Sequence, residues 1–161
     1  MATQVRMTGV DELVARLESV KYDVKYKGGR FALRKAAQVV RDAAKSNAQG
    51  IDDPETASAI YKNITERWGS KTFKRTGDLS FRVGVLGGAR ITKKAPKGSQ
   101  PVGPGGDTRY WAYVEFGTER SRAQPFMQRA LQQNAQAATD MFIRQYSIAI
   151  DRALKKAAKV R

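Results

Sequence analysis

Apolar residues recur at helical spacing in three stretches before residue 70. The predicted amphipathic helices span residues 9–21, 30–48 and 54–68. Gly28-Gly29 predicts a break ahead of the second helix, because paired glycines are poor helix formers. Asp53 followed by Pro54 predicts the start of the third helix, since the carboxylate can accept backbone N–H groups and proline fits the first turn.

Two later stretches carry strand patterns. Residues 79–86 alternate apolar and polar side chains, which is typical of a half-buried strand. Residues 110–116 are rich in aromatic and β-branched side chains and are followed by Gly117, which favours a buried strand closed by a turn. The 87–109 segment between them holds six glycines and three prolines, so we expect a long mobile loop that joins both strands as an antiparallel hairpin.

The last part of the chain predicts one long helix, from Pro125 to about Ala158. A helix of this length either packs against a neighbouring subunit or breaks near Gln132. We therefore expect a single α+β domain over residues 1–161, with a small antiparallel β-sheet packed against helices, a basic hairpin loop and a long C-terminal helix.

The charge of the chain favours a polyanionic neighbour. Thirty basic residues stand against fifteen acidic ones, a net charge of +15. Nucleic acid, an anionic membrane and an acidic protein surface all fit, and so does plain solubility with assembly against an acidic partner. The basic residues of the 87–109 loop are candidates for contact with DNA, although a solvated loop explains them equally well. They are Arg90, Lys93, Lys94 and Lys97.

The missing residue types argue against catalysis. The chain has no cysteine and no histidine, which removes thiol nucleophiles, thiolate metal sites and the commonest general base. We expect no enzyme, no cofactor and no bound metal, and no apolar run approaches the roughly 18 residues that a membrane span needs.

Individual residues near the 110–116 stretch have structural explanations. For Glu115 a salt bridge to a basic neighbour is favoured over a catalytic role, because no second acid or base is marked nearby. Gly117 fits a backbone angle that other residues resist, and Thr118 fits a turn cap. The aromatic residues that periodicity assigns to the core, rather than to base stacking, are Trp68, Tyr110, Trp111 and Tyr113.

One pair of motifs resembles a known family. Tyr113-Val-Glu-Phe-Gly-Thr118, followed by Gln124-Pro-Phe-Met-Gln-Arg-Ala-Leu131, is similar to a pattern in small tail-completion (minor tail) proteins of long-tailed bacteriophages, the lambda protein Z type. Further similar stretches are Gly9-Val-Asp-Glu-Leu13, Ala36-Ala37, Arg41-Asp-Ala-Ala-Lys45 and Thr76-Gly-Asp-Leu79. The motif residues that become interface candidates are Tyr113, Glu115, Phe116, Gly117, Thr118, Pro125 and Phe126.

The resemblance implies a structural virion protein, made in the bacterial host cytoplasm, at the head-proximal end of the tail. Such a protein completes the tail and helps join it to the head. The implied partners are further copies in a ring of six, the tail tube or terminator, the head–tail connector and genomic DNA in the channel. The alternative is a phage-encoded nucleic-acid-binding protein acting through its basic surface, although no helix-turn-helix, zinc or ribonucleoprotein signature supports it.

Overall fold

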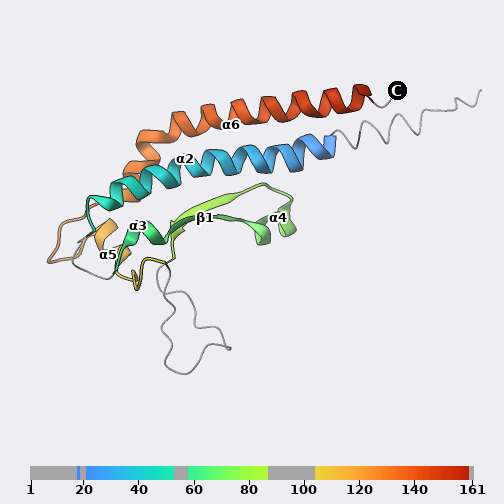
Figure 1. Ribbon diagram of the computed structural model, residues 1–161. Coiled ribbons are helices and arrows are strands. Elements are labelled where there is room, and N and C mark those ends of the chain that lie inside the picture. Colours follow the sequence, from blue (N-terminus) through green and yellow to red (C-terminus); the bar gives the residue numbers. More distant parts are fainter. Residues whose placement is uncertain (1–17, 19–20, 53–57, 87–103, 160–161) are drawn as a thin grey trace, which may run out of the picture.

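The computed structural model describes residue 18 and residues 21–52, 58–86 and 104–159. The predicted helix 9–21 and the loop residues 87–103 fall mostly or wholly outside this part of the chain. The described elements form an α+β fold in which α2 lies between the long helix α6 on one side and a two-stranded antiparallel sheet on the other (Figure 1).

The central helix begins earlier than predicted. A π-helical turn, η1 (Asp23–Gly28), runs without interruption into α2 (Gly29–Gln49). The predicted helix 30–48 is confirmed, but the predicted break at Gly28-Gly29 is wrong. A Cβ on Gly28 would lie 2.8 Å from the Cβ of Ala149, and one on Gly29 would lie 2.8 Å from Cδ1 of Leu79. These glycines therefore allow other elements to approach the helix closely.

The long C-terminal helix is confirmed. α6 (Phe126–Lys159) has 34 residues and passes Gln132 without a break. It packs lengthwise on α2 of the same chain (Figure 1). Its first turns are its most buried part, because Phe126 and Ala130 lie in the core, while Ile143 and Leu154 further along are exposed.

The sheet differs from the prediction in one of its strands. β2 (Phe81–Val85) confirms the predicted strand 79–86, but it pairs with β1 (Ile64–Trp68), from Ile64 opposite Val85 to Trp68 opposite Phe81. The predicted helix 54–68 is therefore confirmed only at residues 60–63. It is wrong at residues 58–59 and 64–68, and residues 54–57 lie outside the described part of the chain. Side chains suited to strands explain the difference, since β1 contains β-branched and aromatic residues that pack across the pair.

Short helices flank the sheet. Before β1, α3 (Ile60–Asn63) begins where the Asp52 carboxylate accepts the backbone N–H groups of Ile60 and Tyr61, at 2.9 and 3.0 Å. The predicted cap, Asp53, lies outside the described residues. Between the strands lies a second short helix, α4 (Ser70–Thr76).

The 110–116 stretch is a helix, α5 (Trp111–Phe116), and the predicted buried strand is wrong. The predicted hairpin between residues 79–86 and 110–116 is consequently wrong too. Helical spacing places Trp111 and Val114 against the core and buries Glu115, while Tyr113 and Phe116 face outward. The apolar content of this stretch therefore serves a helix with one buried side, and not a strand.

A small core joins the elements. Its buried side chains come from α2, α3, β1 and α6, and Trp111 and Val114 of α5 pack against it. Its members are Ala44, Ala48, Ile60, Ile64, Phe126 and Ala130. Because the alanines are small, α2 and the start of α6 approach closely around Phe126.

Candidate interaction surface

Glu115 fixes the corner between α5 and α6. Its buried carboxylate accepts the backbone N–H of Met127 at 3.0 Å and that of Gln128 at 2.9 Å. These N–H groups lie in the first turn of α6, where no helical carbonyl is available and where the helix dipole favours a negative charge. The expected salt bridge to a basic side chain is therefore replaced by a helix cap.

The turn after α5 matches its sequence prediction. Gly117 has φ +77°, and a Cβ there would lie 2.8 Å from the backbone nitrogen of Ala123. Thr118 pairs with Ser121, and its hydroxyl oxygen accepts the backbone N–H of Arg120 at 3.3 Å. Both features hold the chain in the sharp return that brings α6 against α5.

The aromatic residues of α5 are more exposed than predicted. Tyr113 is 66% exposed and Phe116 is 75% exposed, so the assignment of Tyr113 to the core is wrong. Tyr110 is also on the surface, whereas Trp68 and Trp111 are half-buried. Large aromatic side chains that point outward from a short helix are typical of a contact surface.

An apolar groove of about 640 Å³ opens beside Phe116, and we call it the α5–α6 groove. It lies between α2, β2, α5 and α6, and Leu131, 57% exposed, lines it. Its other apolar lining residues are Leu33, Ala36, Ala37, Val40, Phe81, Val83, Met127 and Ala138. The motif residues Phe116 and Leu131 therefore border a hollow that can receive apolar side chains.

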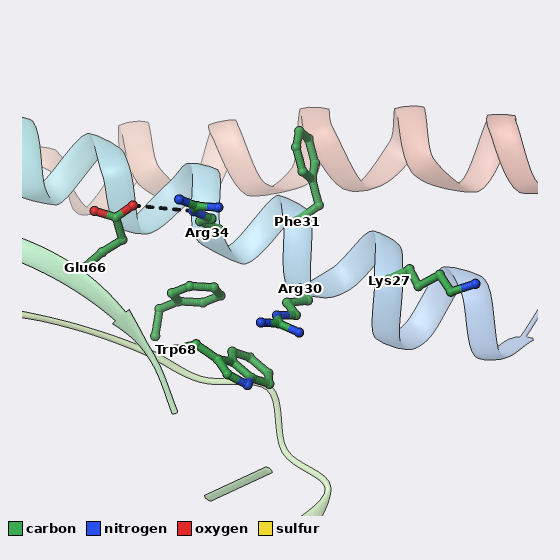
Figure 2. Close-up of a pocket in the computed structure, with 7 residues that line it drawn as sticks. Lys27, Arg30, Phe31, Arg34, Glu66 and Trp68 are labelled. Atoms are coloured by element: carbon green, nitrogen blue, oxygen red, sulfur yellow. Dashed lines mark hydrogen bonds and ion pairs between the residues drawn. The ribbon is translucent and has the colours of Figure 1, made fainter. Parts of the chain in front are cut away.

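A second pocket, of about 410 Å³, lies between the first turns of α2 and the sheet, and we call it the Arg30 pocket. Figure 2 shows Arg30 of α2 pointing toward Trp68, and Arg34 of α2 linked to Glu66 of β1. Phe81 lines this pocket as well as the α5–α6 groove. Sequence reasoning did not predict this pocket, because its residues come from four separate elements, η1, α2, β1 and β2.

A buried carboxylate stands at the edge of the Arg30 pocket. Glu66 Oε2 lies 2.6 Å from Arg41 Nη1, and its Oε1 accepts hydrogen bonds from Gln38 at 3.2 Å and from Arg34 at 3.5 Å. Burial by itself raises the pKa of Glu66, but the hydrogen bonds from Arg41 and Gln38 outweigh it and hold the pKa at about 2. The side of α2 that faces β1 thus carries two arginines that contact this carboxylate.

A buried asparagine fastens the segment that leads to α5. Asn63 Nδ2 donates to the Gly106 carbonyl at 3.0 Å and to the Thr108 hydroxyl at 2.8 Å. Its Oδ1 accepts the backbone N–H of Gly105 at 2.9 Å. The return of the chain after residue 103 is therefore tied to the end of α3.

Several predicted sites lie beyond what the structure describes. The candidates for DNA contact, Arg90, Lys93, Lys94 and Lys97, fall within 87–103. Over the described ranges, no group of His, Cys, Asp or Glu side chains is arranged to hold a metal ion. No helix in the same ranges has the length and apolar character that crossing a membrane requires.

Comparison with known proteins places the chain in one family. A family described as bacteriophage HK97-gp10, putative tail-component, matches residues 11–117, about two thirds of the chain. The match includes α2, the sheet and α5 as far as Gly117. No curated protein and no solved structure matches the chain. The chain belongs to the HK97 gp10-like family of bacteriophage tail components, a structural family not known for enzymes.

Proposed function

We propose that this tail component completes the head-proximal end of the tail of a long-tailed phage and helps join the tail to the head. Membership of the tail-component family supports a structural role. The exposed Phe116 beside the α5–α6 groove supports action through protein contacts, because apolar side chains around a hollow are characteristic of interfaces. The position of the exposed Phe116 beside the α5–α6 groove is the observation on which the proposal rests.

The proposed assembly is a ring. Identical subunits in a closed ring meet through two different patches, one on each neighbour, and an apolar groove with an aromatic rim supplies such a patch. The resemblance to tail-completion proteins implies six copies in the ring. It also implies contacts with the tail tube or terminator and with the head–tail connector. If the ring encloses the channel, Arg90, Lys93, Lys94 and Lys97 are candidates to face the genome.

Electron microscopy of particles made without this gene tests the proposal. We expect filled heads separate from free tails, or tails with abnormal ends, and the wild-type gene supplied from a plasmid should restore joined particles. Leu131→Glu should fail to restore them, because it places a charge in the α5–α6 groove. Leu154→Glu is the matched control, since Leu131 and Leu154 lie on the same helix and are 57% and 56% exposed.

Two results would contradict the proposal. Normal joined particles in the absence of the gene would exclude a role in completion or joining. Equal restoration by Leu131→Glu and Leu154→Glu would remove the α5–α6 groove from the assembly contact. Circular dichroism of both purified variants, compared with the wild type, separates a lost contact from a lost fold.

The net charge of +15 favours a second candidate function, direct binding of nucleic acid. This function predicts affinity for DNA of any sequence that falls steeply as salt rises, and it needs no tail partner. Filter binding of a labelled duplex between about 0.05 and 0.2 M salt measures it. Absence of binding at the lowest salt would exclude this candidate.

A further inference from the structure

The Arg30 pocket holds a positioned cation. The guanidinium carbon of Arg30 lies 4.4 Å from the centre of the Trp68 ring. Trp68 is itself held between Phe73 and Phe81, whose ring centres lie 5.4 and 5.3 Å away. A guanidinium resting on a fixed ring loses little further freedom when its N–H groups bind a ligand. Within the described part of the chain, no carboxylate forms an ion pair with Arg30.

Arg34 adds a second cation one helical turn later. It is exposed, and its contact with Glu66 is made through Nε at 3.5 Å, the long end of hydrogen-bond distance. The charge of Glu66 is already matched by Arg41 at 2.6 Å. The third cation of the pocket, Lys27, has its charge matched by Asp23 at 2.7 Å. Arg30 and Arg34 therefore present positive charge that the described residues leave largely unmatched.

The remaining lining of the pocket is apolar and aromatic. Phe31, 48% exposed, and Phe81 line it together with Trp68. A hollow of about 410 Å³ has room for a few side chains, and not for a folded element. Its shape and chemistry thus fit a short segment that carries both a carboxylate and an apolar side chain.

We propose that the Arg30 pocket binds an acidic segment of a partner protein, whose carboxylates pair with Arg30 and Arg34. The guanidinium fork matches a carboxylate with two parallel hydrogen bonds. The chain's charge of +15 makes an acidic partner a better occupant than a second copy of the same chain. The inference deepens the proposed function, and it rests on that function only in assuming that the chain acts through protein contacts.

The pocket suits nucleic acid less well. Base stacking needs a free aromatic face, and Arg30, Phe73 and Phe81 surround the Trp68 ring. These contacts favour a protein carboxylate over a stacked base.

The test uses a defined probe and the full-length protein. The probe is a fluorescein-labelled heptapeptide of Gly, Asp, Glu, Phe, Asp, Glu and Gly in that order, titrated by fluorescence anisotropy at about 0.15 M salt, where long-range attraction is screened. The Arg30→Gln/Arg34→Gln variant should bind it at least about ten-fold more weakly, because charge-assisted hydrogen bonds are lost. The matched control is Arg129→Gln/Arg144→Gln, which removes the same charge from exposed positions on α6.

Three controls test whether binding depends on the two arginines and on the carboxylates of the peptide. Arg34→Gln alone must also weaken binding. Among the described residues, the side-chain hydrogen bond that it removes is the long one to Glu66, so the protein should still fold. The same peptide with Asn and Gln in place of Asp and Glu should not bind. A single-stranded oligonucleotide of thymidine with the same number of charges should neither displace the peptide nor lose affinity in the Arg30→Gln/Arg34→Gln variant.

Three results would overturn the inference. The first is that the acidic peptide does not bind the wild type. The second is an equal loss of peptide affinity in the Arg30→Gln/Arg34→Gln and Arg129→Gln/Arg144→Gln variants, and the third is displacement of the peptide by the oligonucleotide. The two proposals fail separately. Normal particles without the gene contradict the tail role and leave the binding result standing, whereas a failed titration contradicts only the Arg30 pocket.

Discussion

Glu66→Gln tests the electrostatic link between α2 and the sheet. In the wild type the Glu66 carboxylate is buried, with its side chain 7% exposed, and it is held by Arg41, Gln38 and Arg34. Glutamine has nearly the same shape but no charge, so the substitution removes the ion pair while the packing is kept. The change in stability should therefore report the charge interaction more than the loss of volume.

The pKa sets the magnitude and its dependence on pH. Lowering the pKa of Glu66 from its ordinary 4.5 to about 2 corresponds to about 3 kcal/mol of folding free energy at pH 7. Because the folded state lowers this pKa, the contribution is complete above pH 4.5 and is lost as pH falls toward 2. The difference between wild type and variant should fall from about 3 kcal/mol at pH 7 to about 1.4 kcal/mol at pH 3.

Urea unfolding followed by circular dichroism, at constant ionic strength and at pH 7, 5, 4 and 3, measures this difference. Glu119→Gln, on the exposed turn after α5, is the control and should show little difference from the wild type at any of these values. A difference for Glu66→Gln that stays constant from pH 7 to pH 3 would refute the reasoning, and so would one below about 0.5 kcal/mol at pH 7.

Three further substitutions are tested by urea unfolding at pH 7. Glu115→Ala removes the acceptor of two N–H groups at the start of α6 and should lower the free energy of unfolding by about 2 kcal/mol, against less than about 0.5 kcal/mol for Glu119→Ala. Gly117→Ala should cost about 2–3 kcal/mol, because the position has positive φ and no room for a Cβ. Asn63→Ala should cost about 2 kcal/mol, since it leaves the buried Gly105 N–H without its acceptor. For any of these substitutions, a change in the free energy of unfolding within error of the Glu119→Ala control would contradict the stabilising role given to the residue that it replaces.

The long periodic elements could be predicted from the sequence. Residues 30–48 and 125–158 repeat apolar side chains over many turns, and residues 79–86 alternate clearly, so each pattern fits one structure. Short apolar stretches could not be assigned to a helix or a strand in this way. Residues 110–116 have strand-like composition, yet over seven residues a buried helix face and a buried strand share the same side chains.

Contacts between distant residues explain the other differences. Paired glycines such as Gly28-Gly29 destabilise an isolated helix. Here α6 packs against Gly28, and the absence of a side chain on this residue allows that close approach. The partners of Glu66 lie 25 to 32 residues away on another element, so no local pattern pairs them. The Arg30 pocket likewise exists only after α2 meets both strands.

The position of the protein in the virion tests the central claim most directly. Gold-labelled antibodies against this chain, applied to purified virions and to free tails and viewed by electron microscopy, report that position. The account predicts label at the junction of head and tail in virions, and at the head-proximal end of free tails. Label confined to the tail shaft or to the distal tip, or none on either particle, would contradict it.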